Sequence, residues 1–174
     1  MRSFPLERAH YLADLLTLLR FIIAFVLVYF TFHNFNLRVV SLFVISGWGT
    51  DLFDGRIARI SGGTFLGWFD LPADLCFSAS IFLYEIHRGF IPLKTSLMLT
   101  TAFLMMAITF KSEAPFMFWM GMIYGIFIIL VFLKDLISFI ALILWIIFTV
   151  FLDFSRTSGQ IKKFFSESRK IIGS

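Results

Sequence analysis

The chain has 174 residues, of which 59% are hydrophobic and only 15% are charged, and its mean hydropathy is +0.91. Soluble domains carry about 25% charged residues, so this composition excludes an ordinary soluble domain and indicates a polytopic membrane protein. The net charge of +4 arises from the loops and the C-terminal tail, which favours anionic lipid headgroups over nucleic acid as a partner.

Six apolar segments follow one another along the chain. Each is close to the roughly 20 residues that a helix needs to cross a bilayer, and the short connections favour antiparallel neighbours. We therefore predict an all-α integral membrane protein whose residues 1–154 form one compact bundle of six transmembrane helices. The predicted spans are Leu12–Phe32, Val39–Ile57, Thr64–Ile86, Ile91–Phe110, Pro115–Leu133 and Leu136–Phe154.

The distribution of basic residues predicts the orientation of these spans. If the N-terminus is inside, ten of the lysines and arginines outside the first span lie on cytoplasmic segments and four lie on the opposite side. This asymmetry predicts that both termini are cytoplasmic. Residues 155–174 alternate apolar and basic side chains, which is typical of a basic amphipathic helix on the inner leaflet and also of a solvated basic tail. We expect a multi-pass protein of a bacterial or archaeal plasma membrane.

Four aspartates within 24 residues interrupt the second and third spans: Asp51, Asp54, Asp70 and Asp74. A charged aspartate at the bilayer centre costs roughly 2.5–3.5 kcal/mol on insertion scales. Spacings of three and four residues place each pair on one face of a helix, so two facing helices can bring the four carboxylates together. Carboxylates are ligands that Mg and Mn prefer. We predict one or two divalent ions here, on the cytoplasmic side, and two ions would suit phosphoryl or phosphatidyl transfer.

Neighbouring residues allow two interpretations of this cluster. Gly55 and Ala58 open a groove beside the carboxylates, and Arg59 supplies a cation whose geometry suits a phosphate. Alternatively, the aspartates lie at helix ends and pair with Arg56 and Arg59, which explains two carboxylates more readily than four. Arg20 lies inside the first span, where it either contacts an aspartate or a phosphate or extends its guanidinium to the membrane interface.

The order Asp51-x-x-Asp54-Gly55-x-x-Ala58-Arg59, followed by Gly67, Asp70 and Asp74, resembles the signature of the CDP-alcohol phosphatidyltransferase family. Residues 15–20, Leu-Leu-Thr-Leu-Leu-Arg, resemble the N-L-L-T-L-L-R opening common in these enzymes. The chain departs from the pattern in several places, among them a short loop after Arg59. Two residues, and not the usual three, separate Gly67 from Asp70, and Asp14 stands where the family often has Asn.

The resemblance implies a phospholipid-synthesising transferase that moves a phosphatidyl group from CDP-diacylglycerol to a small alcohol and releases CMP. Asp74 would be the general base, and two Mg or Mn ions would bind Asp51, Asp54, Asp70 and Asp74. Phosphatidylglycerophosphate and phosphatidylinositol-phosphate synthases are the members it suggests, so glycerol 3-phosphate is the first expected acceptor, followed by inositol phosphate or serine. Family members usually form dimers, so a homodimer is also compatible with it. The residues it implies for the CDP moiety are Thr50, Asp51, Asp54, Gly55, Ala58, Arg59 and Thr64. A phosphorylated acceptor needs cations near the metal ions, and the candidates are Lys111 at the cytoplasmic end of the fourth span and Arg156 just after the sixth.

Two other function classes stay open. A cation-binding membrane transporter explains intramembrane carboxylates, but it does not explain Gly55, Ala58 and Arg59 at their spacing. A catalytically silent relative of the family is favoured only by the short Gly67–Asp70 segment. Release of CMP distinguishes the transferase from both, and flux of metal ions into liposomes would favour the transporter.

Overall fold

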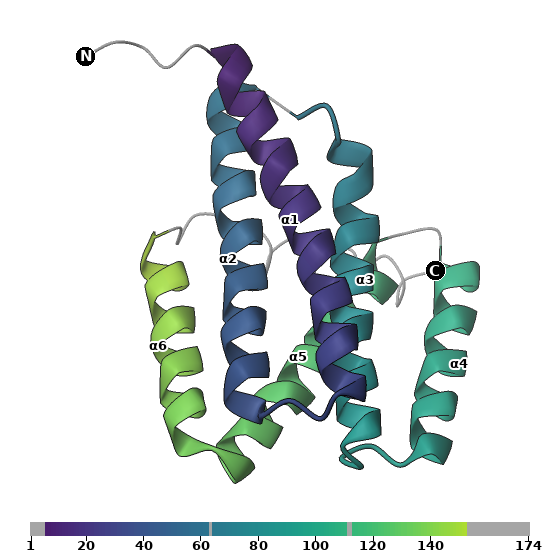
Figure 1. Ribbon diagram of the computed structural model, residues 1–174. Helices are drawn as coiled ribbons and strands as arrows, with labels where there is room; N and C mark the ends of the chain where they lie inside the picture. The colour runs from purple at the N-terminus through teal and green to yellow at the C-terminus, as the bar shows by residue number, and fades with distance from the viewer. Residues whose placement is uncertain (1–5, 63, 111–112, 153–174) are drawn as a thin grey trace. The chain divides into compact units, whose positions relative to one another are not determined.

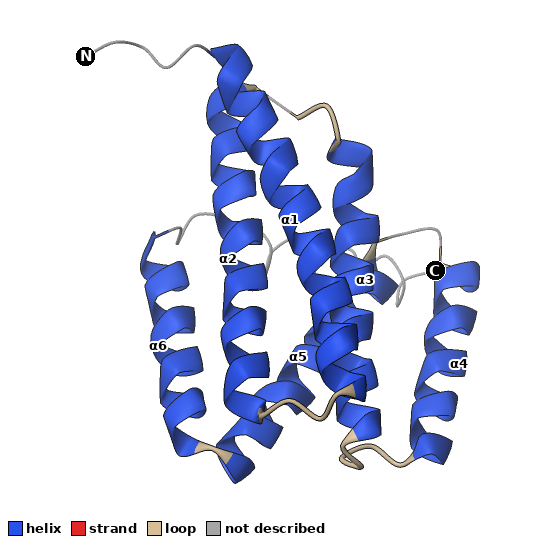
Figure 2. Cartoon of the chain, in the orientation of Figure 1, coloured by secondary structure: helices blue, strands red, loops and turns tan. Residues whose placement is uncertain are grey.

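The computed structural model describes residues 6–62, 64–110 and 113–152. It contains six helices in these ranges (Figure 1), and no strand occurs among the residues described (Figure 2). The prediction of an all-helical chain with six helices is therefore confirmed, whereas the predicted tail, residues 155–174, lies outside the described residues. The helices are α1 (Leu6–Phe32), α2 (Leu37–Ser61), α3 (Gly67–His87), α4 (Leu93–Thr109), α5 (Ala114–Lys134) and α6 (Leu136–Leu152).

Within the described chain, two of these helices are long and apolar enough to cross a membrane: Ala9–Phe32 of α1, and α5. Helices α4 and α6 are apolar but have 17 residues each. At 1.5 Å per residue each is about 26 Å long, slightly less than the hydrocarbon core of a bilayer. Helices α2 and α3 carry the aspartates, which lower their hydropathy. Length and composition thus mark two candidate spans, fewer than the six predicted from the sequence.

Helix α2 ends at a glycine turn, and helix α3 begins at Gly67, three residues later than predicted. Gly62 has a left-handed backbone (φ 84°), and its N–H donates to the carbonyl oxygen of Ala58. Glycine adopts this conformation without the steric cost of a Cβ, which makes it the usual residue after a helix end. The later start places Asp70 in the first turn of α3 and Asp74 one turn farther on.

The chain divides into two compact units, residues 1–84 and residues 85–174. In the first unit, α1 packs along α2 after the short connection at residues 33–36 (Figure 1). The buried face of α1 has positions alternately four and three residues apart, the spacing of helices that pack side by side. These positions are Ala13, Thr17, Arg20, Ala24, Leu27 and Thr31. Thr17 and Arg20 therefore lie on the packed face of α1.

A close approach between α2 and α3 occurs at Gly47. A Cβ atom built on Gly47 would overlap the ring of Phe77, which is itself buried. The missing side chain lets an aromatic ring of α3 lie directly on the backbone of α2. Small residues commonly permit such close approaches between membrane helices. Gly47 lies about one turn before Asp51, and Phe77 about one turn after Asp74. This contact therefore fixes the spacing of the two helices next to the acidic pairs.

Substituting Gly47→Ala is expected to lower the free energy of unfolding by about 1–3 kcal/mol, because the new methyl group overpacks the contact with Phe77. Gly121→Ala is the matched control, since a Cβ at Gly121 of α5 meets no atom within 4 Å. The control should leave stability unchanged or raise it, because alanine favours the helix. Denaturant unfolding in detergent measures both variants, and equal midpoints would contradict the close contact.

The second unit holds α4, α5 and α6. Helix α4 packs on α5 through Phe103, whose ring stacks on that of Trp119 with the centroids 4.7 Å apart. Helix α5 ends at Lys134 with Asp135 as its C-cap, and the hydroxyl of Ser138 donates to Asp135 Oδ2 over 2.9 Å as α6 begins. Short side-chain bonds of this kind satisfy polar groups where one helix follows another. The aspartate at this junction thus has a structural role.

Glu85 is a buried acid outside the acidic cluster. Its side chain is fully buried, and neither carboxyl oxygen has a hydrogen-bond partner among the residues described. Glu85→Leu is therefore expected to raise the free energy of unfolding by about 1–3 kcal/mol, since it removes an unsatisfied polar group. Glu113→Leu, at an exposed acid, should change it little. A loss of stability in Glu85→Leu, measured by unfolding in detergent, would show that the carboxyl has a partner in the folded protein.

Candidate functional site

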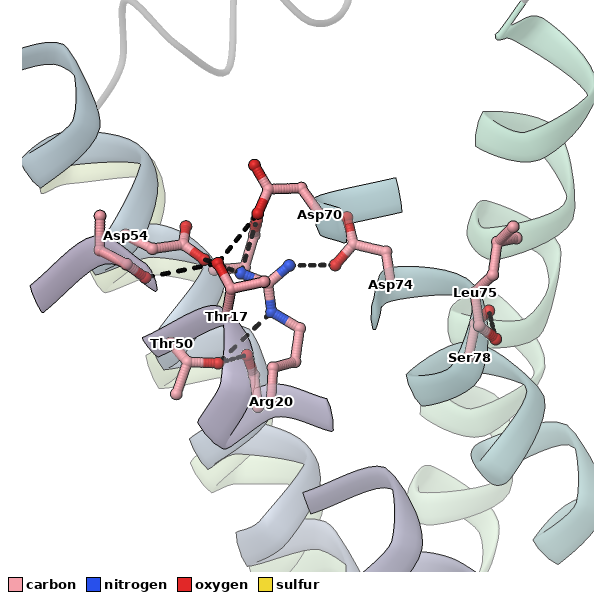
Figure 3. A network of polar contacts seen from close by, with 11 residues as sticks. Thr17, Arg20, Thr50, Asp54, Asp70, Asp74, Leu75 and Ser78 are labelled. Atoms are coloured by element: carbon pink, nitrogen blue, oxygen red, sulfur yellow. Dashed lines mark hydrogen bonds and ion pairs between the residues drawn. The ribbon is translucent and has the colours of Figure 1, made fainter. Parts of the chain in front are cut away.

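The four aspartates of the predicted cluster all lie in the first unit. Asp51 and Asp54 are one turn apart on α2, and Asp70 and Asp74 are one turn apart at the start of α3. Figure 3 shows the carboxylates of Asp54, Asp70 and Asp74 directed toward the side chains of Thr17 and Arg20, which come from α1. Two acidic pairs from separate helices thus meet at a third helix.

The guanidinium of Arg20 lies at the centre of this cluster (Figure 3). Its Nη1 donates to Asp74 Oδ1, and its Nη2 donates to Asp54 Oδ2. The same Nη2 lies 3.5 Å from Asp51 Oδ1. The Arg20 side chain is only 2% exposed. One buried cation therefore contacts three carboxylates, which arise from both α2 and α3.

Thr50 orients this guanidinium. Its hydroxyl oxygen accepts a hydrogen bond from Arg20 Nε over 3.4 Å and donates its proton to the carbonyl oxygen of Gly47 over 2.7 Å. A hydroxyl has one proton, so donation to Gly47 leaves lone pairs facing Arg20. Thr50, which the resemblance assigns to the CDP moiety, is thus also a buried contact of the central arginine.

Thr17 joins the remaining aspartate to the cluster. Its hydroxyl oxygen lies 2.9 Å from Asp70 Oδ1 and 3.3 Å from Asp54 Oδ2. Because the hydroxyl can donate only one proton at a time, the shorter contact indicates that Asp70 is the main acceptor. Thr17 thereby connects the first turn of α3 to α1 and lies next to the acidic pair of α2.

Asp14 contacts the residue that precedes α3. Its Oδ1 accepts a hydrogen bond of 3.0 Å from the backbone N–H of Leu66, the residue just before α3. The side chain is buried, and the bond attaches the start of α3 to α1. An asparagine side chain offers the same kind of acceptor oxygen, so Asp and Asn can both make this contact.

Three α1 residues, Asp14, Thr17 and Arg20, make contacts in or beside the cluster that the sequence did not resolve. The alternative in which Arg20 extends to the membrane interface is wrong, because its side chain is buried among carboxylates. A signal was present in the sequence. The four-three spacing that contains Ala13, Ala24 and Leu27 places Thr17 and Arg20 on the same helix face.

The other residues assigned to CDP lie at the end of α2 and just beyond it. Gly55 and Ala58 are half-buried, and Arg59 is exposed in the last turn of α2. Thr64 is half-buried in the connection to α3, where a Cβ on Gly67 would lie 3.0 Å from its hydroxyl oxygen. These four residues therefore continue along the chain from the acidic pair of α2.

Lys111 and Arg156, expected at an acceptor phosphate, both lie outside the described residues. Their assignment stays a prediction from the sequence. Acceptor recognition is therefore the part of the predicted site for which the described chain supplies no contact.

The donor set of the cluster suits a hard divalent cation. Exposure of the carboxylates rises from 9% at Asp54 to 28% at Asp74 and 42% at Asp51, so the outer ones are accessible. The single charge of Arg20 balances only one of four carboxylates, and oxygen anions are the ligands that Mg and Mn prefer. The described residues nevertheless contain no group of three or more acidic, histidine or cysteine side chains already arranged to hold a metal ion. The guanidinium of Arg20 lies between two of the candidate ligands.

Comparison with models of protein families, with curated proteins and with solved structures finds no match for this chain. A functional assignment therefore depends on the residues of the cluster and on their chemistry.

Proposed function

We propose that this chain is a membrane-embedded CDP-alcohol phosphatidyltransferase, which moves a phosphatidyl group from CDP-diacylglycerol to a small alcohol and releases CMP. The observation that carries the proposal is the convergence of both acidic pairs on Arg20 and Thr17. An acidic cluster made by chance from two helices would not be expected to bring a buried arginine and a hydroxyl into register with it.

The apolar surface of the described helices supports a membrane location. Long side chains on α1, among them Leu15, Ile22 and Phe25, are more than half exposed, and so are Ile129 and Leu133 on α5. Monomeric soluble proteins rarely expose contiguous apolar patches larger than a few hundred Å². We propose that these faces contact lipid, that six helices span the membrane, and that the cluster opens toward the cytoplasm, as the basic residues indicate.

Residues of α2 supply binding groups for the donor. Gly55 has no side chain and Ala58 carries only a methyl group, so they would leave room beside Asp54 for the donor. The exposed guanidinium of Arg59 would offer a planar pair of donors to a phosphate. Asp51, Asp54, Asp70 and Asp74 would hold Mg or Mn. Such ions supply positive charge that balances a diphosphate and its leaving group.

Asp74 is the proposed general base. Arg20 holds its Oδ1, so the other oxygen, Oδ2, is left to accept a proton from the acceptor hydroxyl. That hydroxyl oxygen forms a bond to the phosphorus bearing diacylglycerol, the bond from this phosphorus to the CMP oxygen breaks, and CMP leaves with the electron pair. The partial exposure of Asp74 allows an acceptor to reach it.

The test is CMP release by the detergent-purified protein with CDP-diacylglycerol, Mn or Mg, and a panel of glycerol 3-phosphate, inositol phosphate and serine. Release that requires one acceptor would support the transferase and identify its substrate. The proposal would be contradicted by liposomes that take up Mn while no acceptor gives CMP, since this result indicates a transporter. If the protein gives no CMP release and no ion flux, the result indicates a catalytically silent relative.

A further inference from the structure

Arg20 already behaves as a cation bound at the cluster. Its two Nη atoms contact Asp54 Oδ2 and Asp74 Oδ1, and Asp51 Oδ1 lies 3.5 Å from Nη2. These carboxylates come from two different helices, so the guanidinium itself connects α2 to α3. The buried arginine therefore balances charge and also links the two helices that carry the carboxylates.

The same oxygens are ligands that a divalent ion would use. A metal ion bound by Asp54 and Asp74 would have to replace the guanidinium at Asp54 Oδ2 and Asp74 Oδ1. Otherwise it would bind with only some of the carboxylate oxygens. A fixed positive charge a few ångströms away also repels the incoming ion, strongly so in a partly buried site. Arginine and metal ion therefore compete for one set of carboxylates.

We propose that Arg20 is an internal counter-cation that keeps the four carboxylates together before a metal ion arrives, and that the metal ion must displace it from Asp54 and Asp74. This inference rests on the metal site of the proposed function. The presence of Arg20 weakens the affinity of the cluster for the metal ion, but it keeps the four carboxylates assembled. Thr50 stabilises the arginine in the cluster, because its hydroxyl accepts from Nε while the two Nη atoms contact the carboxylates.

The experiment measures Mn²⁺ affinity by electron paramagnetic resonance of the full chain in detergent, without CDP-lipid. Arg20→Gln is expected to bind Mn²⁺ at least about tenfold more tightly than the wild type, a factor typical of coupling between two binding events. Arg20→Lys should stay close to the wild type because it keeps the charge. Unchanged or weaker binding in Arg20→Gln would overturn the proposal and assign the arginine a purely structural role.

Arg38→Gln is the matched control, since it removes the same charge from an exposed residue in the first turn of α2. It should leave Mn²⁺ affinity unchanged, and a rise equal to that of Arg20→Gln would reduce the effect to net charge and contradict the proposal.

A second variant keeps the test decisive if Arg20→Gln does not fold. Thr50→Val removes the hydroxyl that accepts from Arg20 Nε, while the shape of the side chain is kept. With Arg20 held less firmly, Mn²⁺ should bind more tightly, and unchanged or weaker binding would contradict the competition. The affinity measurement contains no CDP-lipid, so it is independent of the separate assay for CMP release. Tighter Mn²⁺ binding by the variants, together with no CMP release by the wild type in that assay, would uphold this inference and reject the transferase. CMP release by the wild type, together with unchanged Mn²⁺ affinity in the variants, would support the transferase and reject this inference.

Discussion

Replacing Asp74 with asparagine is expected to lower acceptor-dependent CMP release by about 10²–10⁴-fold, the usual contribution of a general base. The amide is too weak a base to take a proton from the acceptor hydroxyl. Its oxygen can still accept the hydrogen bond from Arg20, so the cluster should stay assembled. Initial rates at saturating Mn and donor measure the effect, which should appear in kcat more than in KM.

Asp135→Asn is the matched control for this substitution. It makes the same chemical change at the junction of α5 and α6, where the amide oxygen can still accept from Ser138. Its rate should equal that of the wild type. If the two variants lose activity equally, or if Asp74→Asn keeps its full rate, Asp74 is not the base.

A comparison of Asp54→Asn with Asp51→Asn is expected to give the largest difference in stability. The Asp54 carboxylate is 9% exposed and contacts Arg20 directly, whereas that of Asp51 is 42% exposed and lies 3.5 Å from the guanidinium. Removing one charge of a buried, hydrogen-bonded pair costs about 2–5 kcal/mol. Removing an exposed partner costs about 1 kcal/mol or less.

Unfolding in detergent with a chelator present measures this difference, because metal ions would otherwise add their own binding energy to the folded state. The two aspartates are one turn apart on the same helix, so each variant serves as the control for the other. Equal losses of stability would contradict the assignment of Arg20 as the buried centre of the cluster.

The helices and the acidic pairs could be predicted because both depend on local sequence. Apolar segments of helical length identify six elements, and spacings of three and four residues place Asp51 with Asp54 and Asp70 with Asp74. The turn at Gly62 was also visible as a glycine pair, although the exact start of α3 was not. It depends on the bond from Leu66 to Asp14, which joins residues 52 positions apart.

The role of α1 could not be predicted with the same certainty, because it depends on contacts between helices. Arg20 reaches Asp74 across 54 positions of the chain, and Thr17 reaches Asp70 across 53. A single arginine in an apolar segment fits an interfacial position as well as a buried one until its partners are known. The helix register decides between the two positions, and it is set by the packing of α1 on α2.

The most direct test of the central claim is mass spectrometry of the lipids formed when the wild-type protein is incubated with CDP-diacylglycerol, Mn and glycerol 3-phosphate. We predict a new phospholipid in which the acceptor has replaced CMP, formed in step with CMP and absent when the acceptor is omitted. If the donor stays intact with every acceptor tested, or is only hydrolysed, the chain is not a phosphatidyltransferase.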